Sequence, residues 1–301
     1  MSDLYFILAG IVVGFAVGVT GVGGGSLMTP ILISVLGVPA QIAIGTDLLY
    51  ASISKFCGSA VHAKKLNIVW SVVFWLALGS IPASFATTWA LNHFFSSANE
   101  YKKILTLVLG FMLTLTGVSI VFRSKIEDFF QRIRLKRNQE ASIARDDFSD
   151  PYDVKNNIPV LIMGVVLGIL VTLSSVGAGA FGVMALLLLF PNLPMIRIIG
   201  SDVAHAVLLT LVAGLGHLLS GNVDFHILTF LLIGAIPAII AGTLLSSSLP
   251  ERIIRPILGI TLLLLGINFL VNPSKEKPHK VEAHAVAVVG TASQPLLNPA
   301  S

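Results

Sequence analysis

The feature that most constrains this chain is a series of long apolar blocks. Each block carries at most one or two charges, and together they cover residues 4–38, 42–62, 68–92, 103–122, 158–196, 203–219, 225–250 and 253–271. A helix needs about 20 residues to span a bilayer, so these blocks are long enough and too numerous for a buried soluble core. Only 11% of the 301 residues are charged, whereas a soluble domain has about 25%. We therefore predict an all-α, multi-pass protein integral to the cell (inner or plasma) membrane.

Charge and motifs argue against other classes of function. The lysines and arginines behind the net charge of +4 lie mainly between the apolar blocks, where the orientation rule of membrane proteins explains them without nucleic acid. Cys57 is the single cysteine, which excludes a Cys-rich metal site; we expect no metal and no cofactor. The sequence has no His-Glu-x-x-His and no Gly-x-Ser-x-Gly motif, so we expect no enzyme.

The sequence repeats itself at an offset of about 155 residues. The matches include polar residues and prolines, which compositional bias does not explain: Gly10, Gly14, Gly23, Gly25, Asp47, His62, Asn67 and Pro82 meet Gly164, Gly168, Gly177, Gly179, Asp202, His217, Asn222 and Pro237. We predict a first membrane repeat over residues 1–123 and a second over 158–272. A basic cytoplasmic linker, 124–157, joins them, and a polar, disordered tail, 273–301, follows.

Each half opens with an apolar stretch that runs into a glycine-rich break. The breaks are residues 19–26 and 173–180. About 15 apolar residues precede each break, and as a helix they reach only about 23 Å, short of the roughly 30 Å hydrocarbon core. We predict two homologous repeats, each with a broken or re-entrant helix pair and about three spanning helices. Interrupted segments at matching places in two repeats are typical of transporter binding sites.

We expect a small anion to bind between the two breaks, near the bilayer midplane. Backbone N–H groups freed from helical bonding and the positive ends of the helices that follow would attract it. The expected binding residues are Thr20, Gly21, Gly23, Gly24, Gly25, Ser26, Ser174, Ser175, Gly177, Gly179 and Lys55. The alternative for the glycines is close helix packing, which we favour for the four-residue spacings Gly10/Gly14 and Gly164/Gly168.

Several motifs together resemble the sulfite exporter family TauE/SafE. They are the glycine-rich openings, the Gly-Thr-Asp and Gly-Ser-Asp pair, the Gly-x-Ile-Pro-Ala element and, most specifically, residues 214–225. The resemblance covers roughly residues 5–271. It implies a permease for small anions, chiefly sulfite, sulfonates and other organosulfur anions.

A few ionisable residues inside the blocks are candidates for coupling transport to protons. They are Asp47, Asp202, His205, His62 and His217. The alternative for the two aspartates is a helix N-cap, and for His62 and His217 it is anchoring at the membrane interface. Lys55 lies in mid-block, where it would either bind the anion or snorkel to the headgroups.

The charge pattern leaves the orientation of the repeats open. The basic linker is expected in the cytoplasm. If each opening enters and leaves on one side, the repeats are inverted and both termini are outside; if each opening crosses once, the repeats are parallel and both termini are inside. The count of lysines and arginines is the same in both cases, and we favour inversion because the openings are short. An anion channel or a membrane subunit of a larger complex is the alternative function, and a homo-oligomer is compatible with the sequence.

Overall fold

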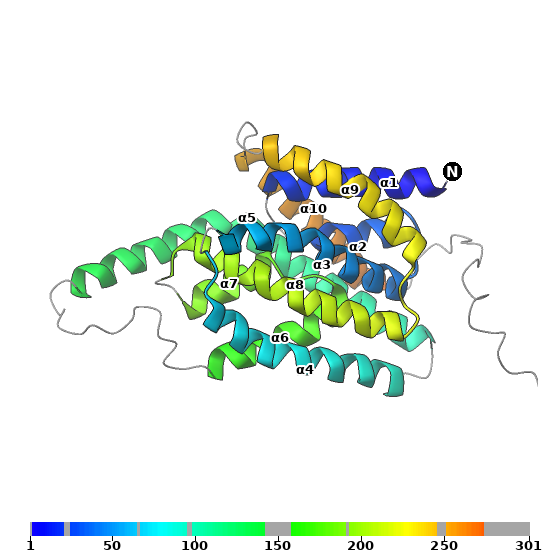
Figure 1. The fold of residues 1–301 in the computed structure, drawn as a ribbon, viewed down its shortest axis with the longest axis horizontal. Helices are drawn as coiled ribbons and strands as arrows, with labels where there is room; N and C mark the ends of the chain where they lie inside the picture. The colour runs from blue at the N-terminus through cyan, green and yellow to red at the C-terminus, as the bar shows by residue number, and fades with distance from the viewer. Residues whose placement is uncertain are drawn as a thin grey trace, which may run out of the picture.

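The computed structural model describes residues 2–20, 25–64, 67–94, 98–141, 158–190, 193–245 and 251–273. Within these ranges the chain forms ten α-helices and no strand. The all-α prediction is therefore confirmed for the described part of the chain. Figure 1 shows the helices packed side by side along one long axis.

The two halves have the same order of helix lengths. In the first half, a long and a short helix precede three long ones: α1 (Ser2–Thr20), α2 (Gly25–Ser34), α3 (Ala40–Lys64), α4 (Trp70–Phe94) and α5 (Ala98–Ala141). The second half follows the same order: α6 (Ile158–Ser174), α7 (Ala180–Leu189), α8 (Met195–Leu219), α9 (Phe225–Leu245) and α10 (Glu251–Val271). Each expected break thus separates a helix from a short 10-residue one.

Four described helices are long and apolar enough to cross a membrane. They are α4, α8, α9 and residues 100–122 of α5. Many large apolar side chains on the outer surface of the bundle are exposed, among them Phe74, Trp89 and Leu264. This exposure fits a surface that faces lipid, and it agrees with a multi-pass membrane protein.

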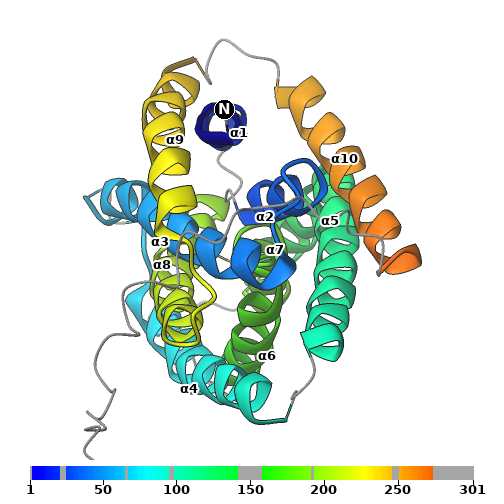
Figure 2. The same cartoon turned by 90° about the vertical axis from the view of Figure 1, so that its right-hand side faces the viewer.

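Glycines bring helices of opposite halves into close contact. In two helix pairs, α1 with α9 and α6 with α4, a Cβ added to the glycine would strike the backbone of the neighbouring helix. The contacts are Gly10 with Leu231 and Gly14 with Ala235 in one pair, and Gly164 with Leu76 and Gly168 with Ser80 in the other. The packing interpretation of these four glycines is confirmed. Figure 2 shows α1, seen end-on, beside α9, and α4 beside α6.

The contacts between helices fix which end of the bundle each helix starts from. We call the end where α1 begins the first end, and the opposite one the second end. At the first end, Asp3 meets His226 at the start of α9, and the Thr46 hydroxyl near the start of α3 accepts from the Asp224 N–H. At the second end, the Val69 N–H before α4 donates to the Ser201 hydroxyl near the start of α8.

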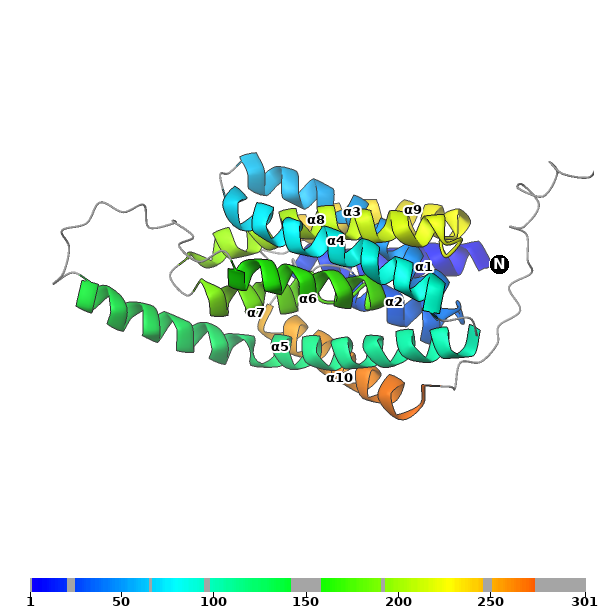
Figure 3. The ribbon, with the colours of Figure 1, turned by 90° about the horizontal axis from the view of Figure 1, so that it is seen from below.

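The directions of the remaining helices follow from similar contacts. Helix α6 runs parallel to α4, as the glycine contacts show, and α10 runs antiparallel to α5 because Gly110 meets Gly266 and Gly117 meets Gly259. Helices α1, α3, α5 and α9 begin at the first end, and α4, α6, α8 and α10 begin at the second end, as can be followed in Figure 3. The first half therefore starts at the first end and finishes at the second, and the second half does the reverse.

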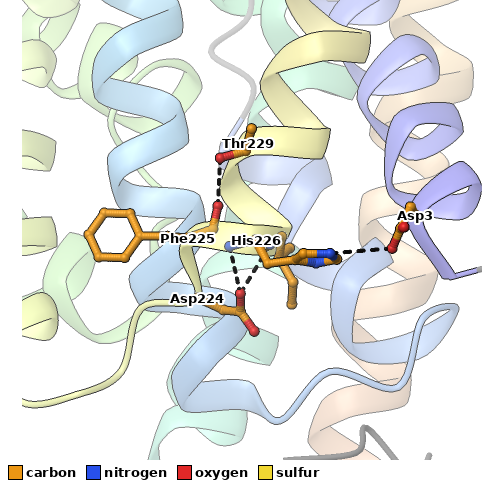
Figure 4. Close-up of polar contacts among 6 residues, drawn as sticks. Asp3, Asp224, Phe225, His226 and Thr229 are labelled. Carbon is orange, nitrogen blue, oxygen red and sulfur yellow. Dashed lines mark hydrogen bonds and ion pairs between the residues drawn. The ribbon is translucent and has the colours of Figure 1, made fainter. Parts of the chain in front are cut away.

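The start of α9 is fixed by its own side chains and by α1. The Asp224 Oδ1 atom accepts the N–H groups of His226 and Ile227, at 2.9 and 3.1 Å, and so caps the helix (Figure 4). The His226 Nε2 atom lies 3.4 Å from Asp3 Oδ1. These contacts tie the beginning of the chain to the beginning of α9.

The expected linker begins inside a helix. Helix α5 continues past residue 123 to Ala141, so residues 124–141 are helical rather than a connecting loop. Residues 142–157 of the expected linker and 274–301 of the expected tail lie outside the described part of the chain.

Candidate functional site

The second break is an irregular turn buried in the protein. Ser175, Gly177 and Gly179 have φ angles of 57°, 118° and 136°, which fall in the region that favours glycine. The Ser174 hydroxyl accepts the Val176 N–H at 3.2 Å, which holds the start of the turn. Ser174 and Ser175 are both buried. The break therefore exposes backbone groups to protein rather than to lipid, as the membrane interior requires.

Lys55 of α3 reaches this break from the other half of the chain. Its ammonium donates to the carbonyl oxygen of Ala178 at 2.7 Å, and its side chain is buried. It points into the protein rather than toward the headgroups, so the snorkelling alternative is wrong for Lys55. The buried amine of Lys55 thus lies directly at the second break.

Asp47 and Asp202 do not cap their own helices. Asp47 is the eighth residue of α3 and Asp202 the eighth of α8, and the N-cap position of α8 is occupied by Pro194. Each aspartate instead meets the short helix of its own half. Asp47 accepts a hydrogen bond from Thr29 of α2, and a Cβ at Gly182 in the first turn of α7 would strike Asp202 Oδ1. The N-cap interpretation is wrong, because both helices begin two turns earlier than the Gly-Thr-Asp and Gly-Ser-Asp motifs indicate.

The two carboxylates have different surroundings despite their matched positions. Position 183 corresponds to Thr29 and carries valine, so α7 offers no hydroxyl to Asp202. Within the described part of the chain, both oxygens of Asp202 lack a hydrogen-bond partner, although its side chain is only 1% exposed. Lys55 interacts electrostatically with both aspartates, without a direct ion pair to either among the described residues.

Asp47 also faces the second break. Ser175 lies close enough to influence its carboxylate, yet Asp47 Oδ1 and the Ser175 hydroxyl are both without a hydrogen-bond partner. The second break therefore lies among Asp47, Lys55 and Asp202. Buried polar atoms without partners are rare in native proteins, and their concentration here marks the region as a candidate binding site.

Two buried histidines of α8 bind polar groups of neighbouring helices. His205 Nε2 lies 2.8 Å from the hydroxyl of Ser80 in α4, and His217 Nε2 lies 3.0 Å from the carbonyl oxygen of Thr172 in α6. Neither side chain is exposed, and both Nδ1 atoms are without partners. Interfacial anchoring is therefore wrong for His217, which faces the interior of the bundle.

The structure brings only part of the expected site together. Lys55, Ser175, Gly177 and Asp202 gather at the second break, with Ser174 and Gly179 at its two ends. In the first break, Ser26 is buried in α2, and Gly25 begins that helix. Gly21, Gly23 and Gly24 lie outside the described residues, and the side chains of Thr20 and His62 are not described.

Three residues at this site escaped the sequence analysis. Thr29, Ser80 and Gly182 are the residues that meet Asp47, His205 and Asp202. A lone hydroxyl or glycine in an apolar helix is common in membrane proteins, so the sequence gives no sign of its partner. Only the arrangement of the helices distinguishes these three from other small residues.

The comparisons with known proteins agree on one family. The family model described as "Sulfite exporter TauE/SafE" matches residues 6–269. A "probable membrane transporter protein YjnA" of Bacillus subtilis is 37% identical over 264 residues, which cover 88% of this chain and 98% of that protein. A "probable membrane transporter protein" of Methanocaldococcus jannaschii is 25% identical over 87% of this chain and 94% of its own length. No solved structure matches the chain.

Proposed function

Because the chain belongs to the sulfite exporter TauE/SafE family, we propose that this membrane transporter carries small anions, namely sulfite, sulfonates or other organosulfur anions. We propose a secondary transporter that works by alternating access, with the anion bound between the two glycine-rich breaks. The observation that carries the proposal is the second break itself. It is an irregular buried turn with a buried lysine beside it and a short helix starting from it.

The chemistry of the second break suits a small oxyanion. Lys55 donates a hydrogen bond at the break and, when protonated, supplies a positive charge; the start of a helix such as α7 adds about half a positive charge. Three residues in left-handed conformation let backbone groups approach a ligand closely. The hydroxyl of Ser175 makes no hydrogen bond among the described residues, although it lies close to Asp47, and it can donate to a bound anion.

Asp202 provides a mechanism for coupling to protons. Its carboxylate lies against the first turn of α7 and interacts with Lys55. The start of α7 and Lys55 are also the groups that would attract an anionic substrate. An ionised Asp202 and the anion therefore compete for the same partners. Protonation of Asp202 removes the competing charge, so proton and anion bind together.

The helix directions support inverted repeats. The first half starts at the first end and the second half starts at the second end, and α2 and α7 each lead the chain back toward the end where the half began. With the basic linker in the cytoplasm, the first end and both termini are outside the cell. Opposed halves around a central site are the usual architecture for alternating access.

Purified protein in proteoliposomes tests the proposal. We expect saturable binding and uptake of at least one of sulfite, thiosulfate, sulfoacetate and taurine, with uptake that depends on a proton gradient. Uptake that rises linearly with concentration and ignores the gradient would favour an anion channel. An absence of binding to all four compounds would contradict the organosulfur assignment. Stable co-purification with other membrane proteins would favour a subunit of a larger complex.

A further inference from the structure

We propose that the proton bound by Asp202 enters from the first end along a polar track between α4, α6 and α8. The inference rests on the proposed coupling at Asp202 and adds the route. The track consists of hydroxyl and imidazole groups on facing sides of these three helices: Ser80, Ser84, Thr88, Thr172, His205 and His217. It begins beside Asp202, since His205 follows Asp202 by one helical turn on the same face of α8.

One face of α4 carries a polar residue at every turn from mid-helix to the first end. Ser80, Ser84, Thr88 and Asn92 are spaced four residues apart. The first three are buried, and Asn92 is exposed. A row of this spacing lies along one side of the helix, so it leads from the interior to the surface of the protein.

Each polar group on this face of α4 meets a polar group or a glycine of α6 or α8. Ser80 Oγ lies 2.8 Å from His205 Nε2, and Ser84 Oγ accepts from the Thr172 hydroxyl at 2.8 Å. Thr88 lies against Gly216, next to His217. At the first end, Asn92 donates to the Ser220 hydroxyl at 2.6 Å. Successive levels are about 5–6 Å apart, a gap that one bridging water closes with two hydrogen bonds.

The matched helices of the other half pack in the same way without three of these hydroxyls, although Thr88 is matched by Thr243. Gly14 meets Ala235 where Gly168 meets Ser80, and α9 carries Ile239 where α4 carries Ser84. Position 18, which corresponds to Thr172, is a glycine. Close packing of the helix pair therefore does not require hydroxyls at positions 80, 84 and 172. Their presence in one half alone indicates a different role.

Asp202 and the two histidines of the track carry buried polar atoms that have no hydrogen-bond partner among the described residues. The Nδ1 atoms of His205 and His217 and both carboxylate oxygens of Asp202 are unpartnered, and all three side chains are at most 1% exposed. Such groups are costly unless they bind water or protons. Asp202 and His205 lie at the inner end of the track, where the proton is bound. His217, in the last turn of α8, lies close to its outer end.

The residues around Asp202 indicate that the proton reaches it along this track. Helix α3 brings Lys55, which also interacts with Asp47 of the same helix, and α8 brings His205. Helices α6 and α7 contain no titratable residue, and His93 of α4 lies at the far end of that helix. On the side of α7, Asp202 lies against Gly182, and the position that corresponds to Thr29 is the apolar Val183. A proton that arrives from the first end therefore reaches Asp202 past His205.

Labelling of an introduced cysteine tests whether the track is hydrated. In a Cys57→Ser background, we would compare Ser84→Cys with Ile239→Cys, its counterpart in the other half. A membrane-impermeant cationic thiol reagent is added on the side of the first end, where α10 ends. A tag fused to the C-terminus identifies this side. Because thiol reaction needs water and access, we expect Ser84→Cys to react about tenfold faster than Ile239→Cys. Equal rates would overturn the proposal, and this experiment needs no substrate.

Proton uptake driven by thiosulfate tests whether the track carries protons. In proteoliposomes with an entrapped pH dye, we expect Thr172→Val to slow proton uptake several-fold while thiosulfate binding is unchanged. The control is Thr106→Val, which removes another buried hydroxyl that binds only its own helix. Full-rate proton uptake in Thr172→Val would overturn the role of the track. If wild-type protein does not transport thiosulfate at all, the proposed function fails, and the labelling still decides whether the track is hydrated.

Discussion

At the scale of single residues, the two aspartates are the sharpest contrast in the molecule. They occupy matched positions, yet Asp47 accepts a hydrogen bond from Thr29, whereas Asp202 accepts none from the described residues. A hydrogen bond to the ionised form of a carboxyl group stabilises that form, so the ionised form is better stabilised in Asp47 than in Asp202. We therefore assign proton binding to Asp202.

Asparagine variants of the two aspartates test this assignment. If one proton binds with the anion, thiosulfate affinity of the wild type rises as pH falls, by up to about tenfold per pH unit. We expect Asp202→Asn to keep the high, low-pH affinity at every pH, because the competing charge is gone. Asp47→Asn is the matched control and should keep the pH dependence. Isothermal titration between pH 5.5 and 8.5 measures both, roughly the range over which such switches act. A pH dependence preserved in Asp202→Asn would contradict the assignment.

Lys55 is the second residue whose role can be isolated. A hydrogen bond to a charged group contributes about 1.5–3 kcal/mol, so we expect Lys55→Met to weaken anion binding about 10- to 100-fold. Lys103→Met, at an exposed lysine of α5, is the control. Lys55→Gln keeps a donor for the Ala178 carbonyl but not the charge. If Lys55→Gln binds the anion as the wild type does, Lys55 only holds the break in place.

At the scale of helices, the glycines divide into two kinds with different roles. Gly10, Gly14, Gly164 and Gly168 let helices of opposite halves touch, whereas Gly177 and Gly179 adopt backbone angles that other residues rarely take. Alanine at Gly177 would also strike Met112. A Gly177→Ala variant is therefore strained in any case, and its loss of binding would not identify the site.

Alanine at the packing glycines is expected to affect stability alone. In both Gly10→Ala and Gly164→Ala the new Cβ strikes a backbone carbonyl of the neighbouring helix. We expect each to lose about 1–3 kcal/mol of stability, as overpacking does, with anion affinity intact in the folded protein. Thermal unfolding in detergent measures the loss, and Val12→Ala, on an exposed position, is the control. A variant as stable as the wild type would show that the helices can separate at no cost.

The positions of the helices could be predicted from the sequence, but the contacts between them could not. The apolar blocks and the glycine breaks indicated where helices run and where they stop. The contact between Lys55 and Ala178 joins residues 123 positions apart, and no local pattern encodes it. The N-cap interpretation of Asp47 failed for a similar reason. Residues 40–46 form two helical turns before it, where the Gly-Thr pair suggested a start.

At the scale of the whole molecule, both ends of the described chain lie at the first end. Helix α1 begins there, and α10 ends there. The charge pattern predicts a cytoplasmic linker, so we expect a C-terminal reporter that fluoresces only in the cytoplasm to stay dark. The same reporter inserted within residues 142–157 should be bright and serves as the control. A bright C-terminal fusion would contradict the inverted arrangement and favour parallel repeats.

The packing of helices from opposite halves against each other also has a consequence for the synthesis and membrane insertion of the chain. Helix α1 packs on α9, which begins 205 residues after Thr20 (225 − 20). At a synthesis rate of about 5–20 residues per second, roughly 10–40 s pass before α9 follows it out of the ribosome. During that interval the glycine face of α1 has no partner of its own chain and must be covered by lipid or by the insertion machinery. We therefore expect the N-terminal half, expressed alone, to be degraded as an unassembled protein. Co-expression of the C-terminal half should restore its level in the membrane.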